Sequence, residues 1–362
     1  MNTAHKILFA FFIIIFFSLP HAVQSYASRY GEALLSTNIS SWDSNQIKMP
    51  AVIYDKSLYK MLYSGQGTNG RWQIGLAYSL DGINWIKFIP PIKSRIAFDN
   101  RDVHDPTWLF NPTTNLYEMW YASSIKGTAF KIFHSESPDG INWSNDNDIM
   151  VHQPEESWEI EMVSCPYVLI VNNQYYMWLA GRNPTGWKIG LFTSVYDHIW
   201  SAETSNPVIS KTYSAEFSQL ISPEVYYDKD SIERKFNMFY STNDNGAASA
   251  ILYAFSNDGI TWTKPLSENP ILTKSSIPLS FDQYGISESS VINTSNSTFI
   301  WYGGNYNGSK GIGLAFLGSA PTPLPTSIDP IFPSLTPTPI PSTSTPTSSS
   351  TPSPSPTPTP IP

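Results

Sequence analysis

Five nine-residue stretches decide the fold: WDSNQIKMP at 42–50, FDNRDVHDP at 98–106, WEIEMVSCP at 158–166, AEFSQLISP at 215–223 and FDQYGISES at 281–289. In four of them an aromatic residue precedes an acid, and four end in proline seven residues after that acid. All five carry an aliphatic residue three positions before the last residue. The acids of successive stretches lie 56, 60, 57 and 66 residues apart in the sequence. Self-similarity at this period indicates a repeat architecture.

Each stretch is followed by the same series of apolar segments. A second apolar segment, such as 59–63 or 117–121, precedes a loop rich in Gly, Asn and Ser, and a third segment such as 74–78 follows. Copies one, two and four then show Asp-Gly-x-x-Trp, in which Asp-Gly is a tight-turn pair that joins antiparallel strands. Four short antiparallel strands per copy, with no helix between them, predict an all-β fold, a five-bladed β-propeller with four-stranded antiparallel blades.

The N-terminal end of the domain supplies the strand that the last copy lacks. The fifth copy ends after its third segment, near Gly318, while Glu32–Leu35 matches the fourth-strand segments 206–209 and 269–272. We therefore expect residues around 30–35 to complete the last blade and to close the ring. The propeller is expected to span 28–319.

Both ends of the chain differ in composition from this domain. Lys6 and the apolar run 7–17 are typical of a secretory signal, which we assign to 1–27, with an uncleaved anchor as the alternative. Residues 320–362 are rich in Pro, Thr and Ser and should form a disordered linker or stalk, because such a segment buries little apolar surface. These features predict a secreted, extracellular or cell-surface protein, with no membrane insertion of the mature chain and with cell-wall or surface attachment through the tail.

Charge and cysteine content exclude several functions. A formal net charge of −8 disfavours nucleic acid, whose phosphates require clustered Lys and Arg. A single cysteine, Cys165, excludes an intramolecular disulfide framework and a cysteine-based zinc site. We expect a monomer without a cofactor or catalytic metal, and a structural cation in the channel stays open as an alternative.

The position just before the proline is the candidate site, because it varies between copies while the scaffold positions repeat. In a propeller the innermost strands surround the mouth of the channel, where ligand pockets collect. This position reads Met49, Asp105, Cys165, Ser222 and Glu288. Glycoside hydrolysis needs two carboxyl groups. We therefore predict Asp105 and Glu288 as catalytic residues, with His104 orienting Asp105; the alternative is that the acids are merely solvated and that His104 packs.

Loops on the same face contain side chains that suit sugars. Aromatic faces stack on sugar rings, and Arg and Asn bond hydroxyl groups. The predicted substrate-binding residues are Arg71, Trp72, Arg182, Trp187, Asn305 and Tyr306. The two tryptophans stand at equivalent positions in their copies, which also suits packing between blades.

The five copies, together with His-Asp-Pro at 104–106, Tyr-x-Met-Trp-Tyr at 117–121 and the Ser-x-Asp-Gly-x-x-Trp turns, resemble the five-bladed propeller glycosidases of families 43 and 32. The resemblance covers residues from about 30 to 318 and implies a divergent member. Of the three acids of family 43 it transfers only Asp105, since Met49 and Cys165 occupy the other two positions. The turns are also similar to the Asp boxes of sialidases, although Asp and Gly are adjacent here.

Two functions follow from these observations. One is an extracellular glycoside hydrolase that acts on a neutral poly- or oligosaccharide through carboxylates at the channel mouth. The other is a non-catalytic propeller that binds glycans or serves surface display. Fold alone does not decide between them.

Overall fold

The computed structural model describes residues 27–37, 41–125, 128–146, 148–196, 199–213, 216–243, 249–306 and 309–323. The predicted signal peptide and tail lie almost entirely outside these ranges. Within them, no helix has the length and apolar character needed to cross a membrane.

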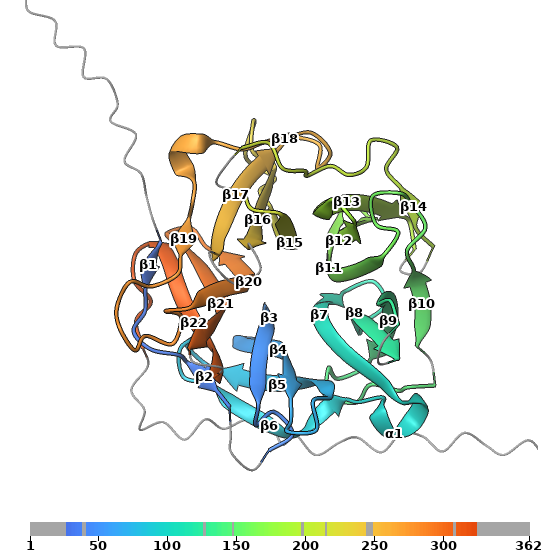
Figure 1. Cartoon of the computed structure of the whole chain (residues 1–362), viewed down its shortest axis with the longest axis vertical. Coiled ribbons are helices and arrows are strands. Elements are labelled where there is room, and N and C mark those ends of the chain that lie inside the picture. Colours follow the sequence, from blue (N-terminus) through green and yellow to red (C-terminus); the bar gives the residue numbers. More distant parts are fainter. Residues whose placement is uncertain are drawn as a thin grey trace, which may run out of the picture. The chain divides into compact units, whose positions relative to one another are not determined.

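The described strands form five antiparallel blades around a central channel (Figure 1), which confirms the predicted propeller. Blade one holds β3 (Gln46–Asp55), β4 (Leu58–Gln66), β5 (Trp72–Ser79) and β6 (Ile86–Lys93), and blade two holds β7 (Arg101–Asn111), β8 (Leu116–Ile125), β9 (Lys131–Ser137) and β10 (Ile149–His152). Blade three holds β11 (Met162–Val171), β12 (Gln174–Asn183), β13 (Gly186–Ser194) and β14 (Ser201–Ala202). Blade four holds β15 (Gln219–Tyr227), β16 (Phe236–Asn243), β17 (Ser249–Ser256), β18 (Trp262–Thr263) and β19 (Leu272–Thr273). Blade five holds β20 (Gly285–Asn293), β21 (Ser297–Tyr306), β22 (Ser309–Gly318), β1 (Ser28–Arg29) and β2 (Leu35–Ser36).

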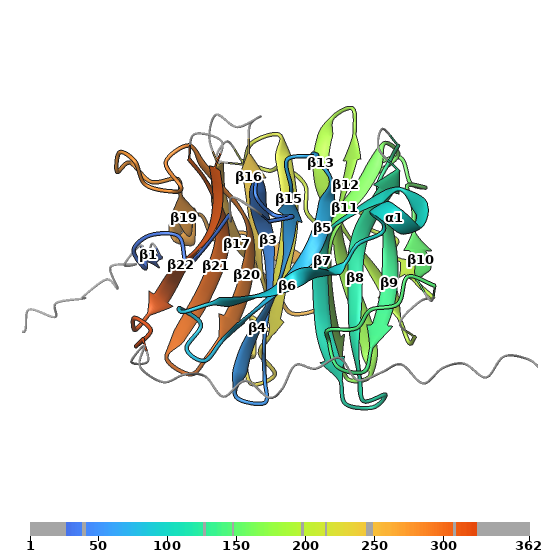
Figure 2. The same cartoon turned by 90° about the horizontal axis from the view of Figure 1, so that it is seen from below.

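The first strand of each blade lies nearest the channel (Figure 1), and the side view shows these strands running along it (Figure 2). The short helices α1 (Ile96–Asp99) and η1 (Leu266–Glu268) lie in connections outside the sheets. Blades three and four are joined by one parallel pairing, between Trp187 and Gln219. Large buried tryptophans pack between neighbouring blades: the ring N–H of Trp178 in blade three donates to Gly259 O of blade four at 3.1 Å, and that of Trp301 in blade five donates to Gly82 O of blade one at 2.9 Å.

The N-terminal segment closes the ring as predicted. Leu35 pairs antiparallel with Ile312, and Ser28 pairs with Phe316, so both β1 and β2 add to the outer side of β22. Arg29 also donates to the buried Asp282 at 2.7 Å. Blade five is therefore built from both ends of the domain, and the closing segment begins earlier than the sequence indicated.

Every innermost strand carries a β-bulge at the residue before the proline position. The pairing with the second strand shifts register there in all five blades. The five bulge residues all adopt left-handed backbone with φ between 46° and 56°: Met49, Asp105, Cys165, Ser222 and Glu288. A bulge re-aims a side chain, and all five residues line one small chamber in the channel. The variable ring expected from the sequence is thus formed.

The repeated acid belongs to the scaffold. In blade one the fully buried Asp43 accepts from the Tyr63 hydroxyl at 3.1 Å and from Lys87 Nζ at 2.6 Å. The same arrangement recurs in two other blades, as Glu216 with Tyr240 and Lys264, and as Asp282 with Tyr302 and Arg29. Because each buried carboxylate meets a cation and a hydroxyl, its desolvation is compensated.

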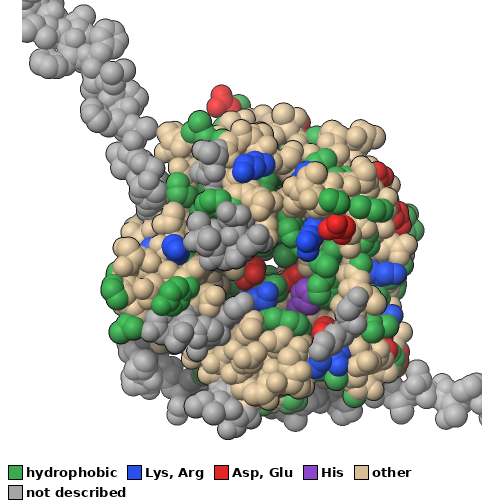
Figure 3. All heavy atoms as spheres, in the orientation of Figure 1, with side chains coloured by type: hydrophobic (Ala, Val, Ile, Leu, Met, Phe, Trp, Pro, Cys, Tyr) green, Lys and Arg blue, Asp and Glu red, His purple; other side chains and the backbone are tan. Residues whose placement is uncertain are grey.

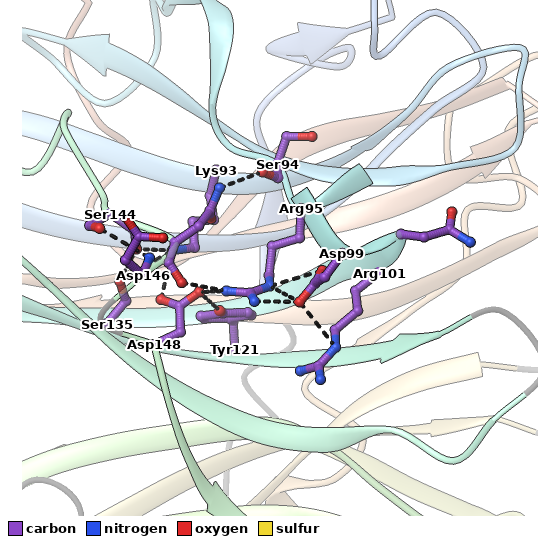
Figure 4. A network of polar contacts seen from close by, with 12 residues as sticks. Lys93, Ser94, Arg95, Asp99, Arg101, Tyr121, Ser135, Ser144, Asp146 and Asp148 are labelled. Atoms are coloured by element: carbon purple, nitrogen blue, oxygen red, sulfur yellow. Dashed lines mark hydrogen bonds and ion pairs between the residues drawn. The ribbon is translucent and has the colours of Figure 1, made fainter. Parts of the chain in front are cut away.

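Blade two departs from this arrangement (Figure 4). The Tyr121 hydroxyl donates at 2.7 Å to Asp148, which also accepts from Lys93 of the neighbouring blade at 2.7 Å. The repeat acid, Asp99, is instead 25% exposed and pairs with Arg95. An acid from a distant part of the chain has therefore taken over the scaffold role, although the sequence motif at 98–99 is intact.

Replacing Leu35 tests the closure. Leu35 is 4% exposed and packs with Trp301 and Ile312. Leu35→Ala should lower the free energy of unfolding by about 2–5 kcal/mol, as cavity-forming core substitutions do, whereas the exposed neighbour Ser36→Ala should leave it nearly unchanged. Urea unfolding followed by tryptophan fluorescence measures both. Equal stability of Leu35→Ala and the wild type would contradict the closure.

Candidate functional site

A cavity of about 420 Å³ opens at the channel mouth. Acidic, basic and histidine side chains gather around the hollow in the middle of this face (Figure 3). Its polar lining includes Lys48, His104, Asp105, Ser164, Glu288 and Asn305. A smaller chamber of about 30 Å³ shares Asp105 and Glu288 with the cavity.

Asp105 is held by its neighbours on two sides. Its backbone N–H donates to Ser64 Oγ at 3.0 Å, which fixes the bulge. Its Oδ2 accepts from the Ser164 hydroxyl and from the Cys165 N–H at 3.3 Å, and lies 3.0 Å from His104 Nδ1. Its Oδ1 is buried and has no hydrogen-bond partner among the described residues. One oxygen is therefore anchored, while the other is buried without a described partner.

The surroundings of Asp105 favour its charged form. Burial by itself raises the pKa of this carboxyl, but the neighbouring His104, the charge of Lys48 and the Ser164 hydroxyl together hold the pKa well below its usual range. Asp105 is therefore a carboxylate at neutral pH. A charged carboxylate can accept a proton or stabilise positive charge that develops on a substrate.

Glu288, in blade five, is held by its neighbours in the same way as Asp105. Its N–H donates to Ser241 Oγ at 2.9 Å, and its Oε1 lies 3.7 Å from Lys48 Nζ. Its Oε2 is buried without a described partner, facing Gly303, where an added Cβ would approach to 3.1 Å. Lys48 Nζ also lies 4.9 Å from the centre of the Trp72 ring. Lys48 thus contacts Glu288 and acts electrostatically on Asp105.

The structure brings five of the predicted site residues to one cavity: His104, Asp105, Trp187, Glu288 and Asn305. The His104 ring also packs edge-on against Phe130, with centroids 4.3 Å apart, so the packing alternative holds alongside its contact with Asp105.

Three of the remaining predicted residues, Arg71, Trp72 and Arg182, are not part of this lining. Arg71 Nε donates to Asp102 at 2.7 Å, and Trp72 lies beneath Lys48. Arg182 pairs with Glu161 at the surface. The side chain of Tyr306 lies outside the described residues.

Sequence reasoning missed Lys48 and Ser164 as site residues. Each stands one position before a bulge residue, so its place in the repeat could have marked it. It also missed Tyr284, which lines the cavity from the segment before β20 and is 51% exposed. No metal site emerges either: among the described residues no three His, Cys, Asp or Glu side chains come together to hold an ion.

Glu224 is a second buried acid in the channel, next to the proline of copy four. It lines the small chamber, and its Oε1 accepts from the Ser290 hydroxyl at 3.2 Å and the Val291 N–H at 3.1 Å. Burial raises its pKa to about 8, more than these two hydrogen bonds lower it. At neutral pH the folded protein therefore keeps this carboxyl neutral.

Comparison of the chain with known proteins supports a carbohydrate-active function. A family model described as β-1,4-mannooligosaccharide phosphorylase, glycoside hydrolase family 130, matches residues 90–310. Two uncharacterised proteins of Mycobacterium tuberculosis are each 27% identical over 150 residues, 38% of this chain and 48% of theirs. The chain thus spans about half the length of the curated relatives it matches.

Solved structures of low identity share the fold. An N-acetylgalactosamine deacetylase from F. plautii, in complex with blood group B trisaccharide, has a TM-score of 0.65 at 15% identity, over 81% of this chain and 95% of its own. A second structure comes from work on family-130 mannoside phosphorylases that describes hydrolases targeting β-1,2 mannosidic linkages in Candida mannan. Its TM-score is 0.59 at 15% identity, and the match covers 84% of this chain and 98% of that one. A thermostable family-43 glycoside hydrolase has a TM-score of 0.56 at 16% identity, and the match covers 77% of this chain and 95% of that one. The expected resemblance to propeller glycosidases is confirmed, with family 130 as the matching family.

Replacing Glu224 tests the state of the second acid. Between the ordinary value of 4.5 and the folded pKa of about 8, folding must protonate Glu224, so wild-type stability should fall as pH rises, by up to about 1.4 kcal/mol per pH unit. Glu224→Gln lacks this dependence. Urea unfolding at pH 5 and pH 8 measures the free energy of unfolding of both proteins. Relative to the wild type, the variant should be more stable at pH 8 than it is at pH 5. A difference that is constant across this range would mean that Glu224 is already ionised in the folded state.

Proposed function

The chain belongs to glycoside hydrolase family 130, the β-1,4-mannooligosaccharide phosphorylase family, and on that premise we propose that it cleaves a glycosidic bond of a neutral oligo- or polysaccharide in the channel-mouth cavity, using Asp105 and Glu288.

The observation that carries this proposal is the pairing of two bulge carboxylates on one cavity. Asp105 Oδ1 and Glu288 Oε2 are both buried acceptors without a described donor. Buried polar groups of this kind require hydrogen-bond donors. Sugar hydroxyl groups supply such donors. A neutral sugar suits the cavity better than an acidic one, because the charged Asp105 would repel an anionic group.

The two acids can take different parts in the reaction. Asp105, which is charged in the empty cavity, can stabilise positive charge that develops on the sugar as the bond breaks. Glu288 is the second carboxyl group of the cavity and the candidate for the proton transfers. Glycoside cleavage requires this division between two carboxyl groups.

Other lining residues suit a sugar chain. Trp187 and Tyr284 present rings on which sugar faces can stack, and Asn305 offers an amide for hydroxyl groups. The family description names mannooligosaccharides, so short mannose chains are the first substrates to test.

The site of action in this proposal is outside the cell. The apolar run at 7–17 behind Lys6 supports secretion, and the Pro-rich residues 320–362 support attachment of the propeller to a cell wall or surface. An extracellular location would give the cavity access to polymeric glycans.

A non-catalytic glycan-binding propeller is the second candidate. The bulge of blade three carries Cys165, whose Sγ lies 3.4 Å from Asp105 Oδ2. Burial, followed by the charge of Asp105, raises the pKa of this thiol well above its ordinary value. A neutral thiol cannot replace a carboxyl group in proton transfer at neutral pH, which favours binding without turnover.

Removal of either carboxylate distinguishes the two candidates. Asp105→Asn should abolish turnover of mannooligosaccharides, and Glu288→Gln should lower kcat by about 100-fold or more, because general acid–base groups contribute about 10²–10⁴-fold. Initial rates by reducing-sugar release or chromatography give these values, and circular dichroism confirms folding.

Asp228→Asn serves as the control, since Asp228 follows β15 and does not line the cavity. Full activity of the Asp105→Asn/Glu288→Gln double variant would sink the catalytic assignment. Glycan binding by a wild-type protein that cleaves no member of a broad glycan panel would instead establish the second candidate.

A further inference from the structure

We propose that a second pocket, at the end of blade two, binds the oxyanion group of an acidic sugar: a carboxylate, a sulfate ester or a phosphate ester. The pocket has a volume of about 340 Å³ and is lined by β7, β8, β9 and β10 and by Thr128 and Ala129. It shares no lining residue with the channel-mouth cavity, although Phe130 of that cavity stands between Ala129 and Lys131 of the pocket. The two sites therefore lie at the same end of the blade, and the second one does not depend on the proposed cleavage.

The charge of the pocket has one sign. Its described lining holds two cations, Arg101 and Lys131, and no Asp or Glu, in a chain whose formal net charge is −8. Lys131 Nζ donates to a neutral acceptor, Gln153 Oε1, at 2.9 Å, and no carboxylate of the described residues pairs with it. A concave surface lined by charges of one sign concentrates ligands of the opposite sign, so this pocket favours an anion.

Arg101 is only partly neutralised by its surroundings. Its Nε lies 3.3 Å from Asp99 Oδ2, but Asp99 is also paired with Arg95. The ion pairs of this network join three cations, Lys93, Arg95 and Arg101, to two carboxylates, Asp99 and Asp148. Figure 4 shows Arg101 at the edge of the network, joined to it through Asp99 alone. Its terminal nitrogens have no acceptor among the described residues, and such a guanidinium fork suits an oxyanion.

A buried hydroxyl group in the same lining lacks a partner. Ser123 is 1% exposed, and its Oγ makes no hydrogen bond to the described residues. Leaving a buried polar group unpaired is costly, and an oxyanion would accept from this hydroxyl. Ser123 lies directly opposite Lys131 in the pairing of β8 with β9. Opposite residues of an antiparallel pair have Cβ atoms about 4.5–5.5 Å apart on one face of the sheet, so the hydroxyl and the ammonium group can reach the same ligand.

Arg101 is brought to this face by an aromatic contact. Its guanidinium group lies 4.9 Å from the centre of the Phe133 ring. Phe133 stands two residues after Lys131 on β9, and alternate residues of a strand point to the same face. The guanidinium, the Ser123 hydroxyl and the ammonium group of Lys131 therefore converge on one pocket. Together they supply donors and positive charge, which is what an oxyanion requires.

The rest of the pocket indicates that the oxyanion is carried by a sugar. A volume of about 340 Å³ is that of a pocket for an organic ligand, for which about 300–1,000 Å³ is usual. Beside the charged end stand the apolar side chains of Ile125, Phe133 and Met150 and the hydroxyl-bearing Ser124 and Thr128. The apolar side chains can contact the C–H face of a sugar ring, and the hydroxyl groups can bond those of the sugar. An inorganic ion would leave this part of the pocket unfilled, and a sugar ligand agrees with the carbohydrate-active family of the chain.

Calorimetric titration of the full chain tests the site without turnover. Glucuronic acid, glucose 6-sulfate and glucose 6-phosphate are compared with glucose up to about 10 mM, tenfold above the usual upper end of enzyme–substrate constants. We expect saturable binding of at least one acidic sugar, weakened by NaCl because salt screens charges, and no binding of glucose. The acidic sugar that binds most tightly identifies the oxyanion.

Variants locate the binding. Lys131→Met and Arg101→Met should each weaken it by about 10-fold or more, because a hydrogen bond to a charged group is lost, and Arg101→Lys should weaken it less than Arg101→Met. Lys229→Met is the matched control, since Lys229 is 80% exposed and lies outside the pocket, and it should bind like the wild type. Circular dichroism checks that each variant is folded.

Four results would overturn the proposal. They are failure of all three acidic sugars to bind, equal binding of glucose, binding that both Lys131→Met and Arg101→Met leave unchanged, and binding that Lys48→Met abolishes, which would place the anion in the channel-mouth cavity. Tighter binding of inorganic sulfate or of a phosphoserine peptide than of any acidic sugar would exclude a sugar as the carrier. Because no result depends on glycan cleavage, the proposed function and this site can fail separately.

Discussion

A left-handed bulge on the innermost strand of each blade turns one side chain out of strand alternation and toward the channel. Five non-glycine residues of this type, one in each blade, are costly, since each left-handed residue costs about 1–2 kcal/mol. Neighbouring blades help to hold the bulges in place, as Ser64 does for Asp105 and Ser241 does for Glu288 through their backbone N–H groups. The ring therefore exists only in the closed propeller, and with it the convergence of two distant acids.

This construction separates stability from chemistry. Buried acids such as Asp43 and Glu216 each meet a tyrosine hydroxyl and a lysine and fasten strands within their blades. The bulge residues carry no such repeated partners, so their identity is free to vary from blade to blade. Carbohydrate-active chemistry can then change at the ring while the blades stay the same, which agrees with a fold that serves a deacetylase as well as glycosidases.

The periodic features of the sequence predicted the fold because strands, turns and bulges recur locally. The ring closure was also readable, since the segment at 32–35 matches the fourth strands of other copies. Contacts between segments far apart in the sequence could not be predicted. Asp148 replaces Asp99 in blade two, and Lys48 meets Glu288 only because the ring brings blade five against blade one. Arg71 and Arg182 were expected at the ligand, but they lie outside the cavity lining and pair with the acids Asp102 and Glu161.

A crystal structure of the Asp105→Asn variant soaked with a mannooligosaccharide tests most directly whether the two carboxyl groups act on a sugar. We expect a sugar chain across the channel mouth, with the glycosidic oxygen between residue 105 and Glu288 and with hydroxyl groups donating to Glu288 Oε2. A sugar bound elsewhere on the propeller, or Glu288 still paired with Lys48 and out of reach of the ligand, would contradict it.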